Sequence, residues 1–302
     1  MTPTPRTDRG VSPWRDAWRR LRRNRSAMAG LIVFGIVALA ALAGPVILAR
    51  TSGATYDRIP SDPALVRAFA PSWQHPMGTD DLGRDLLARV LLGGRISIVV
   101  GLIATTVSLI IGIAYGAVAG FVGGRRDELM MRVVDVLYAL PYMMVVIALL
   151  ALFGDQSAIG QLLLLFAALG AVSWLTTARI VRGQVRSLTQ QEFIVAARAM
   201  GLTPLTILRR HLIPNALGPV IVYATLTVPS VMLLEAFLSF LGLGVQAPLA
   251  SWGSLVADGI QNLAVFPWQL LCPGVTMVIT LGALNVIGDG LRDALDPKGP
   301  PA

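Results

Sequence analysis

The sequence predicts an all-α integral membrane protein with six transmembrane helices and both termini on the cytoplasmic side. The chain has 302 residues, of which 55% are hydrophobic and 14% charged, whereas a soluble domain carries about 25% charged residues. Six stretches contain no Asp, Glu, Lys or Arg: 26–49, 96–124, 136–154, 156–178, 212–234 and 259–288. Each is close to or longer than the run of about 18 residues that crosses a bilayer as a helix. Helices are required because an open sheet cannot satisfy its backbone in lipid.

The distribution of arginines sets the expected orientation. With six spans both termini lie on one side, and 19 of the 25 Lys and Arg residues fall on that side. Because basic residues favour the cytoplasmic side of a membrane, we expect both termini and the polar segment 179–215 in the cytoplasm. The net charge of +8 is therefore interpreted as a topology signal, and no nucleic-acid partner is expected.

The first element is an Arg-rich tail, residues 1–26, in which Trp14, Trp18 and Leu21 recur at i, i+4 and i+7. This spacing is typical of a helix lying in the lipid headgroup region. A basic anchor for the first span, 27–49, is the simpler alternative. A cleaved signal peptide is not expected, because the apolar run starts late and is long.

The next element is an external loop, 50–95, which contains the segment HPMGTDDLGRD. One histidine and three acids that could bind a metal lie close together in it: His75, Asp80, Asp81 and Asp85. We favour a structural interpretation, with Thr79 as a helix N-cap and the two following acids in the first turn, where they interact well with the helix dipole. No metal site is therefore expected.

The second span carries glycines with a packing function. Gly112, Gly116 and Gly120 form two overlapping GxxxG steps on one helix face, which lets another helix approach closely. The partner helix could be internal or come from another subunit. Pro141 in the third span and Pro229 in the fifth predict kinks.

Ionisable residues near the spans are functional candidates by default. Asp135 and Asp289 lie at span ends, each three residues from an arginine, so a local pair explains both. Glu235 ends the fifth span and is expected near the outer face, without desolvation. Its two interpretations are the outer mouth of a pathway and an interfacial hydrogen-bonded acid. The following uncharged stretch, 236–257, is rich in Gly and Pro and is expected to be a surface loop.

The sequence contains no catalytic constellation. Lysine occurs once, at Lys298, so no GxxxxGK[ST] phosphate-binding loop exists and the chain is not expected to be an enzyme. His75 and His211 are predicted on opposite sides of the membrane, and no serine occupies a GxSxG context. The single Cys272 cannot form an internal disulfide.

The polar segment 179–215 predicts a helical hairpin. Its first helix, 190–200, should end at Gly201, a favourable residue just past a helix C-terminus. Thr203 should cap a second helix with Pro204 at its first position. The second helix, LTILRRHLI, should stop before the next proline.

The hairpin also presents little side-chain bulk. Ala196, Ala197, Ala199 and Gly201 would give it a surface that fits a partner's groove. A hairpin that only connects two spans is the alternative.

These residues resemble a known motif. VAARAMG, followed by nine residues and then HLIP, which ends at Pro214, is similar to the E-A-A-x3-G-x9-I-x-L-P motif of permease subunits of ATP-binding-cassette importers. Val195 stands where that family often has Glu. The resemblance implies that the hairpin is a coupling helix that inserts into a cytoplasmic ATPase. The coupling candidates are Glu192, Ala196, Ala197, Arg198, Gly201, Thr203, Pro204, Arg209, His211 and Pro214.

Further segments resemble the C-type permease subunit of dipeptide and oligopeptide importers: RRHLIPN, HPMGTDDLGRDLLARVLLGGRIS, EAFLSFLGLGVQAPLASWG and NVIGDGLRDALDP. The resemblance implies the permease fold of type I importers, with a core at 96–290, a cytoplasmic tail at 291–302 and a place in the bacterial inner membrane. It implies a B-type permease, two ATPases or one fused ATPase, and an external binding protein as partners beside membrane lipid. ATP and Mg would bind the ATPases, and no cofactor is expected here. The implied cargo is dipeptides or oligopeptides; nickel, glutathione or antimicrobial peptides are alternatives, and a secondary transporter is a more distant one.

Overall fold

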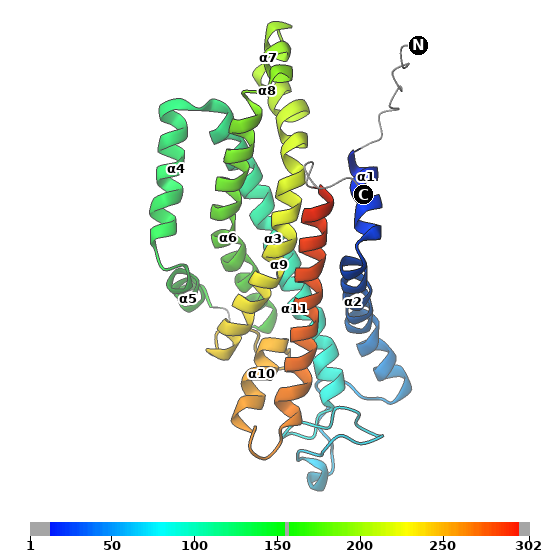
Figure 1. Cartoon of the computed structure of the whole chain (residues 1–302). Helices are drawn as coiled ribbons and strands as arrows, with labels where there is room; N and C mark the ends of the chain where they lie inside the picture. The colour runs from blue at the N-terminus through cyan, green and yellow to red at the C-terminus, as the bar shows by residue number, and fades with distance from the viewer. Residues whose placement is uncertain (1–12, 155–156, 296–302) are drawn as a thin grey trace, which may run out of the picture.

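A computed structural model describes residues 13–154 and 157–295, and within these residues the chain is helical without strands (Figure 1). The helices are α1 (Pro13–Arg23), α2 (Arg25–Thr51), α3 (Leu86–Val122), α4 (Gly124–Ala139), α5 (Tyr142–Phe153), α6 (Ala158–Leu188), α7 (Glu192–Ala199), α8 (Pro204–Ile207), α9 (Ile213–Phe240), α10 (Trp252–Gln261) and α11 (Trp268–Leu295). A 3₁₀ turn, Pro63–Leu65, lies in the loop after α2, and a π-helical turn, Leu208–Leu212, joins α8 to α9.

Five of the predicted spans are single helical rods, and the third is broken. The five rods long and apolar enough to cross a membrane are α2, α3, α6, α11 and the continuous rod Pro204–Phe240. The third span consists of α4 and α5, which meet at an angle of 77°. The break follows from Pro141, because proline disfavours helical backbone at the preceding residue, and Leu140 is extended with ψ 136°. α9 continues as a helix through Pro229.

The arrangement of the rods agrees with the predicted topology. The start of α1 and the end of α11 lie at the same end of the bundle as α7 and α8 (Figure 1). The loop after α2 and helix α10 lie at the opposite end. We call these two ends the hairpin end and the loop end. The assignment of the hairpin end to the cytoplasm stays a prediction.

The glycines of the second span pack against α6, so their partner helix is internal. A Cβ atom on Gly112 would lie 2.5 Å from the Thr177 Cβ, and one on Gly120 would lie 2.7 Å from the Arg182 carbonyl oxygen. At Gly116 the added atom would collide with the Ala178 carbonyl oxygen. Only glycine permits this separation of α3 and α6, which together form the centre of the bundle.

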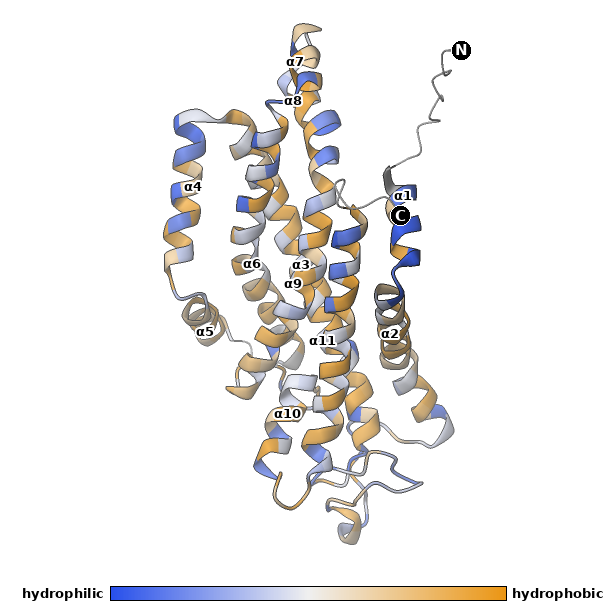
Figure 2. Ribbon diagram, in the orientation of Figure 1, coloured by the Kyte–Doolittle hydropathy of each residue, from blue (hydrophilic) through white to orange (hydrophobic). Residues whose placement is uncertain are grey.

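α1 and α2 lie at the edge of the bundle. Only 6% of the apolar window of α2 is buried by the protein, and Figure 2 shows α2 as largely hydrophobic. In α1, Leu21 is buried against Ala294 of α11, whereas Trp18 is 51% exposed. The two residues therefore do not share one lipid-facing surface as the spacing predicted, and the side chain of Trp14 lies outside the described residues. Asn24 separates the two helices by accepting a bond from Ala27 N at 3.2 Å.

At the loop end, α3 begins later than predicted. Its N-cap is Asp85, which accepts a hydrogen bond from Ala88 N at 2.8 Å, and Thr79 is not a cap. The Thr79 hydroxyl instead accepts from Phe69 N at 2.7 Å and donates to the Arg67 carbonyl at 3.1 Å. The reason is a turn around Asp80, whose Oδ1 accepts from two following backbone amides and so prevents a helix from starting there.

The stretch 236–257 is also more ordered than expected. α9 extends to Phe240, and α10 begins at Trp252 after Ser251, whose side chain takes part in a capping box with Ser254. The expected surface loop is therefore limited to the residues between α9 and α10. α10 packs back onto α9, where a Cβ on Gly253 would collide with Ala236.

Candidate functional sites

The hairpin of α7 and α8 has the predicted local geometry. α7 ends at Ala199 and is followed, after Met200, by Gly201, which has a φ of +79°, and Leu202 N donates back to the Ala197 carbonyl at 3.2 Å. Thr203 caps α8 by accepting from Thr206 N at 3.3 Å, and Pro204 occupies the first turn. These residues fix a rigid turn, and the hairpin extends beyond the other helices in Figure 1.

The second helix does not stop at Pro214. It passes through the π-helical turn, in which Ile213 N donates to the Leu208 carbonyl, and continues as α9. The wider turn accommodates Pro214, whose ring clashes with the carbonyl four residues earlier in a regular α-helix. The hairpin is thus continuous with a helix that spans the bundle.

The hairpin is anchored by one inward-facing stripe. Ile194, Ala197 and Ile207 are buried in a cluster with Val181 and Val185 of α6. Ala197 was predicted to contribute to the small docking surface, and this prediction is wrong because its side chain is only 2% exposed. Its place on the stripe follows from the helical spacing to Ile194.

The outward surface contains most of the other predicted residues. The exposed ones are Glu192, Ala196, Arg198, Ala199, Gly201, Thr203, Pro204, Arg209 and Pro214, and His211 is half-buried. Four large apolar side chains that the sequence analysis missed are exposed beside them: Phe193 at 44%, Val195 at 57%, Met200 at 73% and Leu205 at 59%. An exposed apolar group of this kind marks an interaction surface. Its members could have been found as the large apolar residues outside the Ile194–Ala197 stripe.

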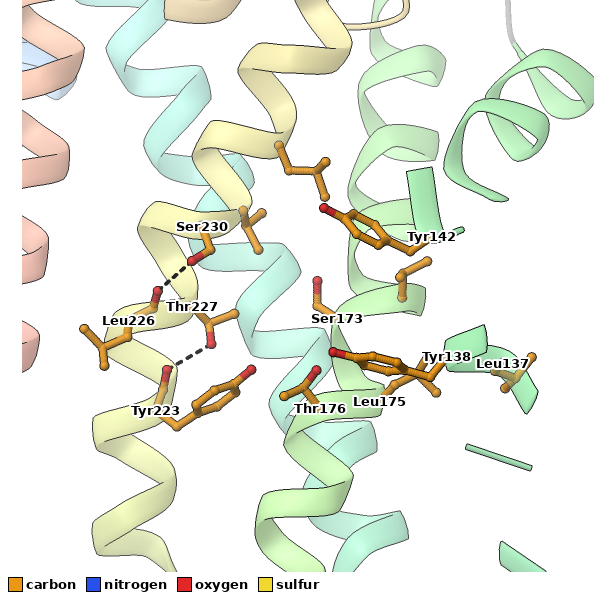
Figure 3. Close-up of a pocket in the computed structure, with 13 residues that line it drawn as sticks. Leu137, Tyr138, Tyr142, Ser173, Leu175, Thr176, Tyr223, Leu226, Thr227 and Ser230 are labelled. Carbon is orange, nitrogen blue, oxygen red and sulfur yellow. Dashed lines mark hydrogen bonds between the residues drawn. The ribbon is translucent and has the colours of Figure 1, made fainter. Parts of the chain in front are cut away.

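A cavity of about 440 Å³ lies between the α4–α5 arm, α6 and α9 (Figure 3). The residues that line it are Leu137, Tyr138, Tyr142, Val172, Ser173, Leu175, Thr176, Tyr223, Leu226, Thr227, Ser230, Val231 and Leu234. None of them is charged. The sequence did not predict this lining, because it comes from three separate segments whose proximity is a tertiary property.

The outer wall of the cavity is held by ion pairs. Asp127 of α4 forms two hydrogen bonds with Arg182 of α6, at 2.5 and 2.6 Å. Asp135 pairs with Arg179 at 2.8 Å, and not with the nearby Arg132 as expected, because α6 faces it. The Arg179 guanidinium also lies 4.2 Å from the ring centre of Tyr138.

Glu235 is buried and lies away from the cavity. Its side chain is 0% exposed, so the expectation of an acid in contact with solvent is wrong. Ser97 of α3 donates to it at 3.2 Å and Ser239 at 2.7 Å. α10 covers this position, since Trp252 N donates to the Ser97 hydroxyl at 3.2 Å. Glu235 therefore joins α9, α3 and α10 and is no part of the cavity lining.

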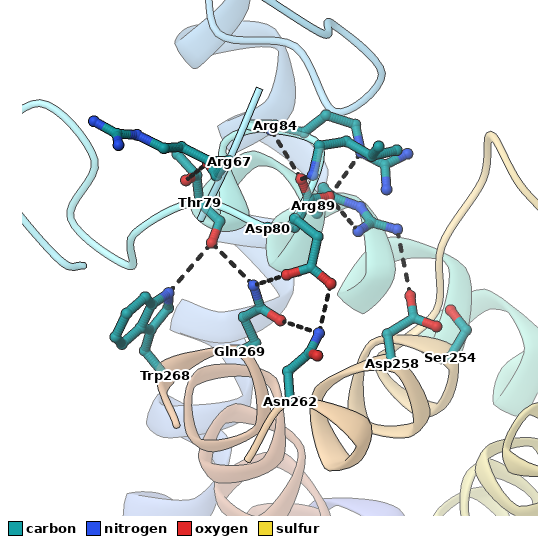
Figure 4. A network of polar contacts seen from close by, with 12 residues as sticks. Arg67, Thr79, Asp80, Arg84, Arg89, Ser254, Asp258, Asn262, Trp268 and Gln269 are labelled. Atoms are coloured by element: carbon teal, nitrogen blue, oxygen red, sulfur yellow. Dashed lines mark hydrogen bonds and ion pairs between the residues drawn. The ribbon is translucent and has the colours of Figure 1, made fainter. Parts of the chain in front are cut away.

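At the loop end, the acids that raised the question of a metal have protein partners (Figure 4). Asp80 accepts from Arg84 at 2.7 Å and from Arg89 at 2.6 Å. Asp81 accepts from Asn262 at 2.6 Å and Gln269 at 2.9 Å, which ties the loop to α10 and α11.

The remaining two groups, His75 and Asp85, pair with each other at 2.8 Å. Among the described residues, no cluster of three or more acids, histidines or cysteines has the arrangement of a metal site. These hydrogen bonds and ion pairs therefore attach the loop before α3 to the helix bundle.

The structure thus combines bent and straight spanning rods, a protruding hairpin and an uncharged cavity between helices. The fold is similar to inward-facing structures of the MetNI methionine ABC transporter, with TM-scores of 0.55 and 0.56. The identity is 18% and 19%, and the match covers 69% or 70% of this chain and 96% of that one. At this identity the similarity establishes the fold.

Sequence comparison gives the family. Residues 112–298 match the family described as binding-protein-dependent transport system inner membrane component, and residues 12–74 match the N-terminal transmembrane domain of oligopeptide transport permease C. The chain belongs to this family of inner membrane transport components.

Individual relatives match over nearly the whole chain. The oligopeptide transport system permease protein OppC of Escherichia coli K12 is 49% identical over 291 residues, covering 96% of this chain and 92% of the relative. The OppC of Bacillus subtilis is 43% identical, covering 96% and 91%. The dipeptide transport system permease protein DppC of B. subtilis is also 43% identical, covering 95% and 87%.

Proposed function

We propose that this chain is a permease subunit of an ATP-driven importer of dipeptides and oligopeptides in the bacterial inner membrane. It forms one side of the translocation pathway, and a second permease of similar fold forms the other. Two ATPase domains, which bind ATP and Mg, dock at the hairpin end. An external binding protein delivers the peptide at the loop end. The names of the relatives support the peptide cargo.

The observation that carries this proposal is the continuity of the hairpin with α9. The hairpin exposes Met200 and Leu205 at its tip and is anchored beneath by Ile194. Helical turns connect α8 directly to α9, which lines the cavity. A partner that moves the hairpin therefore moves a cavity wall, because no flexible linker lies between them.

The coupling role is tested by replacing one exposed apolar side chain of the hairpin. In proteoliposomes that contain the complete importer, Leu205→Glu should lower ATP-driven uptake of a labelled oligopeptide more than tenfold and weaken retention of the ATPase. Leu205→Met, which keeps a large apolar side chain at the same 59% exposed position, is the matched control and should transport normally. Gly201 is a poorer choice, since any side chain would be strained at its positive φ. Full uptake by Leu205→Glu would refute the coupling role.

Cargo is tested with the same vesicles. Labelled dipeptides and oligopeptides, glutathione and nickel are offered separately, each with the binding protein from the same importer. We expect ATP-dependent accumulation of peptides. Accumulation of nickel or glutathione alone would reassign the cargo, and accumulation without ATP would favour a secondary transporter.

A further inference from the structure

We propose that the cavity between the α4–α5 arm, α6 and α9 binds the main chain of an extended peptide through neutral hydroxyl groups, without selecting for side-chain charge. This inference rests on the proposed function, because it assumes that a peptide passes this wall. It adds the residues that contact the peptide and the property that they select.

The first argument is the chemistry of the lining. Seven of the 13 lining residues carry a hydroxyl group, namely Tyr138, Tyr142, Ser173, Thr176, Tyr223, Thr227 and Ser230, and the other six are aliphatic. A tyrosine hydroxyl on a surface facing only lipid tails would lack a partner, which is unfavourable. The concentration of hydroxyl groups around one cavity, within the size range of small-ligand sites, indicates a polar occupant.

The second argument is that donors and acceptors are both available. Tyr138, Tyr142 and Tyr223 all line the cavity, and the first two are 52% and 51% exposed, so their phenol groups are accessible to an occupant. Figure 3 shows Tyr138 and Tyr142 directed from the α4–α5 arm toward α9, and Tyr223 directed from α9 toward α6. These three groups can donate to carbonyl oxygens of an occupant.

The serine and threonine hydroxyls complete the pattern. Ser173 donates to the Leu169 carbonyl at 2.8 Å, and Ser230 donates to the Leu226 carbonyl at 3.1 Å. With their hydrogens used in this way, their oxygens face the cavity as acceptors. An extended peptide offers one N–H and one C=O at each residue, so it needs both kinds of group.

The third argument is the absence of charge in the lining. Arg179 is the cation beside Tyr138, and it is paired with Asp135 at 2.8 Å. A charged peptide side chain would find no oppositely charged partner on this wall. A free ion would lose water without compensation here, whereas a peptide main chain, which has the same groups in every sequence, would be bound equally well.

The test separates main-chain binding from charge selection. The complete importer takes up three tripeptides that differ only in a central lysine, glutamate or glutamine, each supplied with the binding protein at a concentration well below saturation, where the uptake rate reports binding affinity. Tyr223→Phe and Tyr138→Phe remove one hydroxyl each and should slow uptake of all three peptides by the same factor, about 2- to 10-fold for the loss of one neutral hydrogen bond. Tyr56→Phe, which lies outside the cavity, is the control and should have no effect.

A second variant should acquire a preference for one peptide charge, which a misfolded protein would not show. Ser230→Asp places a carboxylate at an exposed cavity position, and its uptake of the lysine peptide should exceed its uptake of the glutamate peptide by about tenfold. Ser230→Asn introduces an uncharged side chain of the same shape as aspartate and should keep the native ratio of lysine-peptide to glutamate-peptide uptake. Unchanged rates in both phenylalanine variants together with an unchanged ratio in Ser230→Asp would overturn the inference. If the native importer takes up no peptide at all, the proposed function itself fails.

Discussion

Helix α6 packs against α3 on one side and α4 on the other, and the two interfaces differ in kind. Against α3 the contact is between backbones. The glycines 112, 116 and 120 of α3 allow it, and Gly170 of α6 meets Val107 in the same way, since an added Cβ would lie 2.9 Å from the Val107 side chain. Such an interface has one geometry and tolerates no added atom.

Against α4 the contact is made by side chains, namely a small apolar cluster in which Met131 and Val134 are buried with Leu175 of α6, and a set of polar contacts. Asp127 and Asp135 pair with arginines of α6, and Tyr115 of α3 donates to the Met130 carbonyl at 2.9 Å. The opposite face of α4 exposes Leu129 at 67% and Val136 at 62%. One face of α4 is therefore held by side-chain contacts, and the opposite face is open.

The comparison separates a fixed part of the molecule from an adjustable one. α3 and α6 form a rigid pair that supports the inner side of the cavity. The α4–α5 arm, broken at Pro141, forms its outer wall and contacts α6 through side chains, which offer more arrangements than a backbone contact does. For the proposed binding of peptides of different size, one rigid and one adjustable wall would be an advantage.

The largest effect is expected when an atom is added to the rigid interface. Gly116→Val would place its Cβ against the Ala178 carbonyl and force α3 and α6 apart, at a cost of about 3 kcal/mol or more. The thermal unfolding midpoint of the full chain in mild detergent should fall by several degrees or the protein should be lost from the membrane. Gly183→Val is the matched control, because nothing lies within 4 Å of its Cβ position. Equal stability of the two variants would show that the interface is not tight.

The next effect concerns the buried acid of the α4 interface. The Asp127 side chain is 3% exposed, and Asp127→Ala leaves Arg182 without its bidentate partner. The expected loss is about 3 kcal/mol, at the low end for a broken buried pair, since Arg182 is itself partly exposed. Thermal unfolding measures it. A double replacement, Asp127→Leu with Arg182→Leu, should recover most of the stability, and failure to recover would mean that the ion pair is not what holds α4.

A smaller loss is expected at Glu235, on the rigid side. Glu235→Ala removes the acceptor for the buried hydroxyls of Ser97 and Ser239, and an unsatisfied buried hydroxyl costs about 1–3 kcal/mol. Glu235→Gln keeps an amide oxygen in place and should retain most of the stability. Hydrogen exchange of α10 is a second readout, because the same network holds Trp252. If Glu235→Gln is as unstable as Glu235→Ala, the carboxylate has a role that hydrogen bonding does not explain.

The sequence predicted what depends on neighbouring residues. Uncharged windows located the spans, Pro141 located a break, and Gly201 with Thr203 located the hairpin turn. Each of these follows from local backbone chemistry. The ends of helices were predicted less well: the helix that was expected to stop before Pro214 continues through it.

The sequence did not predict which side chains meet across helices. Ala197 faces inward because α6 lies beneath it, and Glu235 is buried because α10 folds over it. The start of α3 moved from Thr79 to Asp85 because Asp80 makes a turn that two arginines of the same network stabilise. The cavity lining has no local signature at all, since its hydroxyl groups are separated by long stretches of chain and gather only when α4, α6 and α9 pack.

The smallest effect is expected at the second ion pair of the adjustable interface. Asp135 is 65% exposed and Arg179 38% exposed in their side chains, so water and salt screen their attraction, and exposed pairs contribute about 0.2–1 kcal/mol. Asp135→Asn should therefore lower the unfolding midpoint by no more than a degree or two, and the difference from the native chain should shrink as salt is raised. Arg132→Gln, which removes an arginine that makes no ion pair with Asp135 in the structure, serves as the control. A loss at Asp135→Asn as large as at Asp127→Ala would mean that α4 is fixed along its whole length, and the contrast between a rigid and an adjustable wall would no longer hold.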